Sequence, residues 1–123
     1  MLTPSEQELL RSFDSRGRIT LSAYLRLDSL ERRESAIDEF TQRLQVSLDE
    51  CNPKEDCRKA ITEDLDIVRL YLQTNGHRNH SGLAIFSCAA ELFWRVYPLS
   101  IPIQTQVTVG STFNIQPLLE SAA

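Results

Sequence analysis

The sequence is poor in the residues that most often carry out catalysis, with two histidines, three cysteines and four glycines among 123 residues. Both histidines, His77 and His80, fall in one polar stretch, and no Gly-x-Ser-x-Gly elbow supplies an activated nucleophile. No phosphate-binding loop can be built from the dispersed glycines Gly17, Gly76, Gly82 and Gly110. We therefore assign no catalytic residue, and we expect a protein that is not an enzyme and needs no cofactor.

Long apolar runs are also absent, since no stretch approaches the ~20 residues that a membrane-spanning helix needs. Residues 1–6 lack the basic start and apolar region of a signal peptide. The odd number of cysteines (Cys51, Cys57 and Cys88) favours free or buried thiols over a disulfide framework. Together these features predict a cytoplasmic protein that does not contact a membrane.

A zinc site is the one metal centre that the sequence suggests, through Cys51, Cys57, His77 and His80. The two pairs flank a predicted helix of about 22 residues, which at ~1.5 Å per residue separates them by roughly 33 Å. Zinc ligands lie ~2.0–2.3 Å from one ion, and neither pair has a usual zinc spacing. We therefore predict no metal site.

What is present is typical of a globular chain, with 41% hydrophobic and 24% charged residues. The length fits a single domain, residues 1–123. Its charge is uneven: six arginines face three acids between residues 11 and 33, whereas ten acids face five bases between 34 and 75. The first segment could contact phosphates, although a solvated surface is the commoner reason for such charges, and the net charge of −4 argues against tight autonomous binding to nucleic acid.

The N-terminal part predicts a helix and a strand. Thr3 as N-cap, Pro4 at the first helical position and Glu6 as the reciprocal partner begin a helix that stops near residues 15–17. Residues 18–27 then alternate apolar and more polar side chains, which is typical of a strand with one buried face. Its apolar members are Ile19, Leu21, Ala23, Leu25 and Leu27.

Residues 28–76 predict two long helices folded into a hairpin, with its tip at residues 51–53. Asp28 and Glu31 predict the first helix start, and Asn52 as N-cap with Pro53 predicts the second. The apolar stripe of the first helix consists of Leu30, Ile37, Phe40, Leu44 and Leu48. That of the second consists of Cys57, Ile61, Leu65, Val68 and Leu72, and Asn75-Gly76 forms its C-cap.

The remaining chain predicts strands. Residues 82–87 are expected to form a buried central strand, 92–97 a strand ended by Pro98, and 103–109 a strand with Ile103, Thr105, Val107 and Val109 on one side. The expected fold is therefore α/β of the α+β type: a mostly antiparallel sheet of about four strands packed against a long helical hairpin and a short N-terminal helix.

Three other groups contain residue types that can form sites. Asp64 and Asp66 are expected on a solvated helix surface, and Cys88 as a small buried residue. The aromatic cluster Phe93, Trp94 and Tyr97 could stack bases, but core packing is the commoner role on an alternating strand.

Four segments, in this order, carry a resemblance to a known family: 21–28 (LSAYLRLD), the hairpin with Asp38-Glu39-Phe40, 81–87 (SGLAIFS) and 113–119 (FNIQPLL). The chain resembles the N-terminal domain of the archaeal and eukaryotic class-I peptide chain release factors, and most of all their bacterial release-factor-like relatives. In that family this domain inspects the stop codon in the small ribosomal subunit, while a separate domain with Gly-Gly-Gln releases the peptide. The resemblance implies that residues 1–123 are the first domain of a longer protein.

The codon-reading motifs of that family are mostly lost here. Its Gly-Thr-Ser meets Gly17-Arg18-Ile19, and its Tyr-x-Cys-x-x-x-Phe meets residues 107–113, of which Phe113 is kept. Its Asn-Ile-Lys-Ser meets Asn52-Pro53-Lys54-Glu55 at the hairpin tip, where helix capping explains most of the match. We therefore do not expect this chain to decode stop codons.

Two hypotheses for function remain open. The first is a translation-factor-like domain that associates with the ribosome, through rRNA or mRNA, in rescue, dormancy or quality control. Its expected binding residues are Arg16, Arg18, Arg32, Arg33, Lys54, Arg58, Lys59 and Phe113. The second is a protein-interaction module of a multidomain cytosolic protein that does not bind the ribosome, which the acidic balance of residues 34–75 favours.

Overall fold

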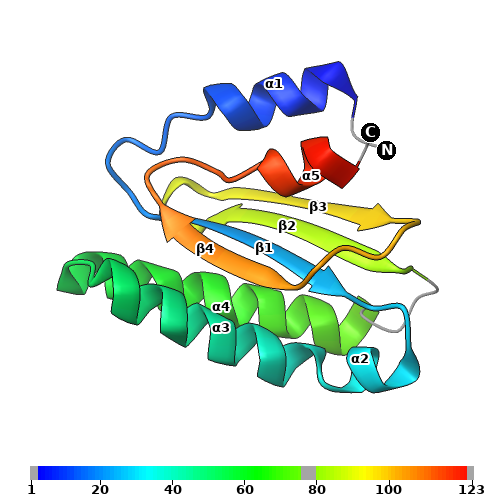
Figure 1. Cartoon of the computed structure of the whole chain (residues 1–123). Coiled ribbons are helices and arrows are strands. Elements are labelled where there is room, and N and C mark those ends of the chain that lie inside the picture. Colours follow the sequence, from blue (N-terminus) through cyan, green and yellow to red (C-terminus); the bar gives the residue numbers. More distant parts are fainter. Residues whose placement is uncertain (1–2, 76–79, 122–123) are drawn as a thin grey trace.

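A computed structural model describes residues 3–75 and 80–121 and shows a sheet between two helical layers (Figure 1). The sheet is antiparallel, with its four strands in the order β3-β2-β1-β4. The helical hairpin covers one face, and α1 (Pro4–Ser12) and α5 (Gln116–Ser121) cover the other. This arrangement confirms the expected α+β fold, with its short N-terminal helix, and adds helix α5, which the sequence did not predict.

Strand β1 (Thr20–Arg26) lies in the interior of the sheet, where it pairs with β2 (Gly82–Cys88) and β4 (Gln106–Gly110). Its apolar residues from Ile19 to Leu27 face the hairpin and are buried, as predicted. The expectation of a single buried face is wrong, because Thr20, Ser22 and Tyr24 on the opposite face are also 0–2% exposed. Helices α1 and α5 shield that side from water (Figure 1).

The first half of the hairpin consists of two helices, and the prediction of one helix from Asp28 is wrong. Helix α2 (Leu30–Glu34) begins at the N-cap Ser29, whose hydroxyl accepts from the Arg32 amide. The helix is interrupted at Ser35, and α3 (Ala36–Cys51) begins directly after it. Leu30, the first residue of α2, is 66% exposed and does not belong to the apolar stripe.

The tip of the hairpin also differs from the prediction. Asn52 does not cap the second helix; it is the left-handed C-cap of α3, at φ 47° and ψ 57°, and its amide donates to the Leu48 carbonyl. Asn is one of the few residues that adopt this conformation readily. Helix α4 (Glu55–Asn75) follows, and the predicted cap at Gly76 lies outside the described residues.

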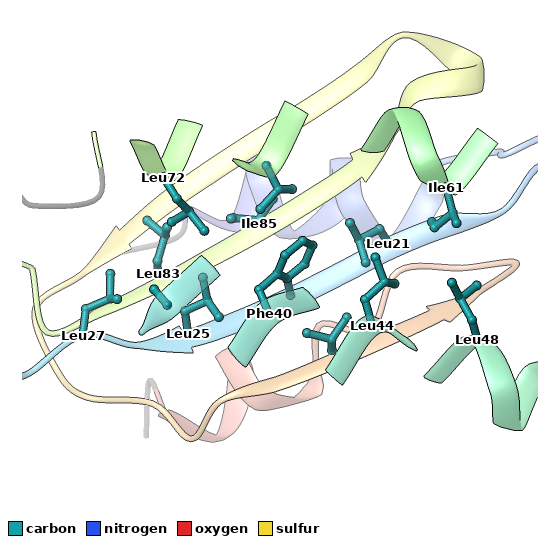
Figure 2. Packing of buried hydrophobic residues seen from close by; sticks show 14 of the residues in the cluster. Leu21, Leu25, Leu27, Phe40, Leu44, Leu48, Ile61, Leu72, Leu83 and Ile85 are labelled. Carbon is teal, nitrogen blue, oxygen red and sulfur yellow. The ribbon is translucent and has the colours of Figure 1, made fainter. Parts of the chain in front are cut away.

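The hairpin buries an aliphatic core against the sheet (Figure 2). Phe40 of α3 lies among side chains from β1, β2, α3 and α4 and is fully buried. The predicted stripes are confirmed on both helices, apart from Leu30: Phe40, Leu44, Leu48, Ile61, Val68 and Leu72 are buried, and Ile37, Cys57 and Leu65 pack against them half-buried.

The second core lies between the sheet and helices α1 and α5, and it is rich in aromatic rings. Tyr24, Phe86 and Phe113 form its buried centre, with Phe13 and Phe93 packed against them. Hydroxyl groups on this face of β1 bond to the backbone of residues 110–114: Thr20 donates to the Gly110 carbonyl, Tyr24 donates to the Asn114 carbonyl, and Ser22 accepts from the Asn114 amide. These bonds hold the segment after β4 on the sheet.

The two outer strands depart from their predicted bounds. Strand β3 (Phe93–Leu99) continues through Pro98, which pairs with Leu83, because an edge strand tolerates a residue without an N–H. Strand β4 begins only at Gln106, and Ile103 joins the aromatic core, so it does not share a face with Val107. The buried strand predicted at 82–87 is confirmed as β2, whose residues are all buried.

Candidate anion-binding site

The basic residues predicted to bind RNA lie at two opposite ends of the sheet. Arg16 and Arg18 belong to the loop before β1, at the same end as the hairpin tip, whereas Arg32 and Arg33 belong to α2 at the other end (Figure 1). The seven residues of β1 separate the two groups by roughly 20 Å. The structure therefore offers no single basic surface that joins all of them.

The hairpin tip carries one more acidic residue than basic residues. Lys54 and Lys59 are exposed there, and the Arg58 guanidinium lies 3.5 Å from the Asn52 side-chain oxygen. Four acidic residues lie in the same turns of chain, at Asp49, Glu50, Glu55 and Asp56. A phosphate at the tip would meet these carboxylates at close range, which makes the tip a poor phosphate site.

Phe113, the remaining predicted binding residue, is a core residue and offers no binding surface. It is 8% exposed, and its ring centroid lies 5.0 Å from that of Phe13, 5.3 Å from Phe93 and 5.5 Å from Phe86. Packing in the aromatic core therefore accounts for this residue.

Three arginines meet at one hollow, and two of them were not predicted. The hollow has a volume of about 530 Å³ and is open to solvent. It is lined by Arg26, Arg32, Glu39, Arg43, Pro102, Ile103, Gln104 and Thr105. Its walls therefore come from the end of β1, from α2 and α3, and from the segment between β3 and β4.

Close backbone packing brings residues 102–105, between β3 and β4, to the hollow. A Cβ at Gly82 would lie 2.9 Å from the Ile101 carbonyl oxygen, so only glycine lets the chain cross β2 there. The Thr105 hydroxyl then accepts a 3.0 Å hydrogen bond from the Arg26 amide. These contacts set residues 102–105 beside the Arg26 side chain.

Two carboxylates hold the guanidinium groups. Glu39 lies 3.6 Å from both Arg32 and Arg43, and Asp28 accepts two hydrogen bonds from Arg26, at 2.8 and 3.0 Å. The hydrogen bond from Arg26 lowers the pKa of Asp28 below its ordinary value, so this carboxylate is ionised at neutral pH. With three guanidinium groups against two carboxylates, the site retains one net positive charge.

The three arginine side chains are 41–49% exposed, which leaves N–H donors free for a ligand. Arg33 lies near them but is used differently, because it donates a 2.9 Å hydrogen bond to the Leu27 carbonyl and fastens α2 to the end of β1. Fork-shaped, permanently charged guanidinium groups suit phosphate and carboxylate oxygens. The hollow thus presents free guanidinium donors of the kind that bind anions.

Sequence reasoning missed Arg26 and Arg43 because each stands alone in its own element. Arg26 was assigned to a strand and Arg43 to a solvated helix face. One local signal was present, since Glu39 and Arg43 are four residues apart on a helix and can form an ion pair. Their approach to Arg26 and to residues 102–105 depends on tertiary packing, which no local pattern reports.

Asp64 corrects another expectation, because it is fully buried and not part of a solvated face. Its carboxylate accepts hydrogen bonds from the Ser87 hydroxyl and the Ala89 amide, and its second oxygen has no partner among the described residues. Burial raises the pKa of Asp64 above its ordinary value. Since Ser87 is also fully buried, the pair joins α4 to the end of β2 and is closed to any substrate.

The other candidates behave as core residues. Phe93, Trp94 and Tyr97 are half-buried, with Trp94 against the aliphatic core and the other two against the aromatic core, which confirms the core assignment. Cys88 is buried as predicted, and all three cysteines are free.

For the zinc hypothesis, His77 lies outside the described residues. Within residues 3–75 and 80–121, no three His, Cys, Asp or Glu side chains come close enough to hold a metal ion. In that same part of the chain, no helix combines the length and apolar character needed to cross a membrane.

Comparison with models of known protein families and with curated proteins finds no match.

Proposed function

We propose that this chain is a non-catalytic, translation-factor-like domain of the cytoplasm that associates with the ribosome. It binds rRNA or mRNA by holding a backbone phosphate in the arginine hollow. The observation that carries the proposal is the convergence of Arg26, Arg32 and Arg43 on one open cavity. The resemblance of four sequence segments, in their order, to the release-factor domain supports RNA as the source of the phosphates.

The ion pairs around the hollow favour a diester over a more highly charged anion. Glu39 and Asp28 orient the guanidinium groups in advance, which reduces the entropy that binding must overcome. They also offset most of the positive charge, so the site matches one phosphodiester group with its single negative charge. Binding at such a site is weak by itself, and we expect it to contribute to a larger contact with the ribosome.

The salt dependence of the affinity distinguishes RNA binding from protein binding, because RNA binding releases counterions. One phosphate contact on single-stranded RNA predicts a slope of log K against log salt of about −0.7, and each further contact elsewhere on the domain adds about as much. Loss of the phosphate contact at the hollow should make the slope shallower by about 0.7 and weaken all sequences alike.

The test is ribosome co-sedimentation at low salt with Arg26→Ala/Arg32→Ala, together with fluorescence anisotropy on a labelled single-stranded RNA. We expect the double variant to bind RNA about tenfold or more weakly and with a shallower salt slope. The matched control is Arg69→Ala, which removes an exposed arginine from α4, away from the hollow. Equal loss of binding in both variants, or binding by neither the wild type nor the control, would refute the proposal.

A second function, a protein-interaction module that does not bind the ribosome, is favoured by the surface of the hairpin. Its apolar residues Val46, Ile67 and Leu70 are 40–62% exposed on a pair of helices rich in acids. Such a surface repels RNA and leaves apolar area for a protein partner. A salt-insensitive protein complex recovered with the wild type and with Arg26→Ala/Arg32→Ala alike would support this alternative.

A further inference from the structure

The arginine hollow has a second part of its lining that carries no charge. The guanidinium groups come from β1, α2 and α3, whereas residues 102–105 supply the uncharged part. The volume of about 530 Å³ lies within the ~300–1,000 Å³ of pockets that hold small organic ligands, and it exceeds what one phosphate group fills. The hollow therefore has room for the sugar that a backbone phosphate carries.

Thr105 is the buried polar residue of this uncharged lining. It is 4% exposed, and its hydroxyl oxygen accepts the 3.0 Å hydrogen bond from the Arg26 amide. A hydroxyl group can also donate one hydrogen bond, and no acceptor for that proton is found within residues 3–75 and 80–121. The hollow is where a partner for this donor can bind.

Gln104 lines the same part of the hollow and is exposed. Its side-chain amide carries both a donor and an acceptor, and among the described residues neither has a protein partner. Together Gln104 and Thr105 thus offer a donor and an acceptor beside the phosphate position. A ligand group that both accepts and donates, as a hydroxyl group does, matches this pair.

We propose that Gln104 and Thr105 recognise the 2′-hydroxyl of the ribose whose 3′ oxygen is esterified to the bound phosphate, so that the domain prefers RNA to DNA. The Thr105 hydroxyl donates to the 2′ oxygen, and the 2′-hydroxyl donates to the Gln104 side-chain oxygen. The 2′-hydroxyl is the group by which a protein distinguishes the two polymers. The inference rests on phosphate binding in the arginine hollow and adds the polymer class to it.

The chemistry of the backbone explains why this hydroxyl and not another one is read. The 2′ carbon is bonded to the carbon that carries the phosphate, so the 2′-hydroxyl keeps a short and nearly fixed distance from the phosphate oxygens. Thr105 is fixed in a similar way on the protein side, because it is hydrogen-bonded to the backbone of Arg26, whose side chain lines the hollow. DNA lacks the hydroxyl and leaves the Thr105 donor without a ligand partner.

The test uses four dinucleoside monophosphates: UpU, UpdU, dUpU and dUpdU. Each has one phosphodiester, so the contribution of the arginines is the same in all four. Only UpU and UpdU carry the 2′-hydroxyl next to the esterified 3′ oxygen, and we expect them to bind about threefold to tenfold more tightly than dUpU and dUpdU. The measurement is an NMR titration of the isotope-labelled full chain, in which the backbone amides of residues 104 and 105 also report where the ligand lies.

Variants of the uncharged lining separate sugar recognition from phosphate binding. Gln104→Ala and Thr105→Val should each bring the affinity ratio of UpU to dUpU closer to one and leave the affinity for dUpdU unchanged. Thr105→Ser keeps the hydroxyl and should keep the ratio. Arg26→Ala/Arg32→Ala should instead weaken all four ligands alike. Because Thr105→Val also removes the acceptor of the Arg26 amide, its fold is checked by circular dichroism, and the exposed Gln104 provides the test if that variant unfolds.

The outcomes distinguish this inference from the proposed function. Equal affinities for the four ligands, or tighter binding of dUpU than of UpdU, would overturn sugar recognition while phosphate binding stands. A preference for UpU that survives in both Gln104→Ala and Thr105→Val would overturn it as well. If none of the four ligands binds, this inference alone fails where the domain still co-sediments with ribosomes, and both proposals fail where it does not.

Discussion

The two faces of the sheet solve the same packing problem with different chemistry. Under the hairpin, long amphipathic helices bury leucine and isoleucine side chains around Phe40 (Figure 2). On the opposite face, two short helices cover aromatic rings and three hydroxyl groups that bond to the backbone of residues 110–114. The first face relies mainly on apolar area, with Asp64 and Ser87 as a buried polar pair. The second face uses more polar side chains, because part of its cover is irregular backbone with donors and acceptors to satisfy.

Removing the centre of the aliphatic face should have the largest effect. Phe40→Ala leaves a cavity among side chains from two strands and two helices, and we expect a loss of about 3–5 kcal/mol in the free energy of unfolding. Urea denaturation followed by circular dichroism measures it. Leu30→Ala is the control, because this leucine is 66% exposed and its removal should cost well under 1 kcal/mol. A small effect of Phe40→Ala would contradict its position at the centre of the core.

Removing one hydroxyl from the opposite face should have a smaller effect. Tyr24→Phe keeps the ring and its edge contact with Phe86 but leaves the Asn114 carbonyl without its donor, and we expect a loss of about 1–3 kcal/mol. The matched control, Tyr71→Phe, keeps a half-buried ring that packs against Trp94. The same urea titration compares the two variants. If both change stability equally, the hydrogen bond to residue 114 does not hold the closing segment.

The same contrast explains what the sequence could predict. The hairpin face has long periodic stripes, and all of the stripe residues except Leu30 reached their expected positions because the spacing of three and four residues is a local property. The true start at Ser29 and the left-handed Asn52 were missed because Asp28 and Asn52 are as good N-cap residues as Ser29 is. No local pattern marks the break at Ser35. Local capping rules do not decide between such alternatives.

The second face and the candidate site were predicted least well, because both depend on segments far apart in the chain. Thr20, Ser22 and Tyr24 read as the polar side of a strand until residues 110–114 pack over them. Likewise, Arg26 and Arg43 become neighbours only once residues 102–105 cross beside Gly82. Asp64 looked solvated because a carboxylate on an amphipathic helix usually is, and only the end of β2 supplies its partners.

Asp64 is the polar exception on the aliphatic face, and its replacement should have the smallest effect of the three, visible mainly as a change with pH. Burial raises its folded-state pKa above the ordinary value of about 3.9. The folded chain therefore holds this proton more tightly than the unfolded chain does. Stability contributed by this group is complete below the unfolded-state pKa and is lost as the pH rises through the folded-state pKa.

Asp64→Asn removes that titration while its side-chain oxygen can still accept from Ser87 and Ala89. The free energy of unfolding of the variant, minus that of the wild type, should therefore increase from acidic to neutral pH. Urea titrations across this range measure the difference, with Asp66→Asn on the exposed side of the same helix as the control. A pH-independent difference for Asp64→Asn would mean that the carboxylate is as well solvated by its two donors as it is by water. The aliphatic face would then accommodate a charge as readily as the polar face accommodates its hydroxyl groups.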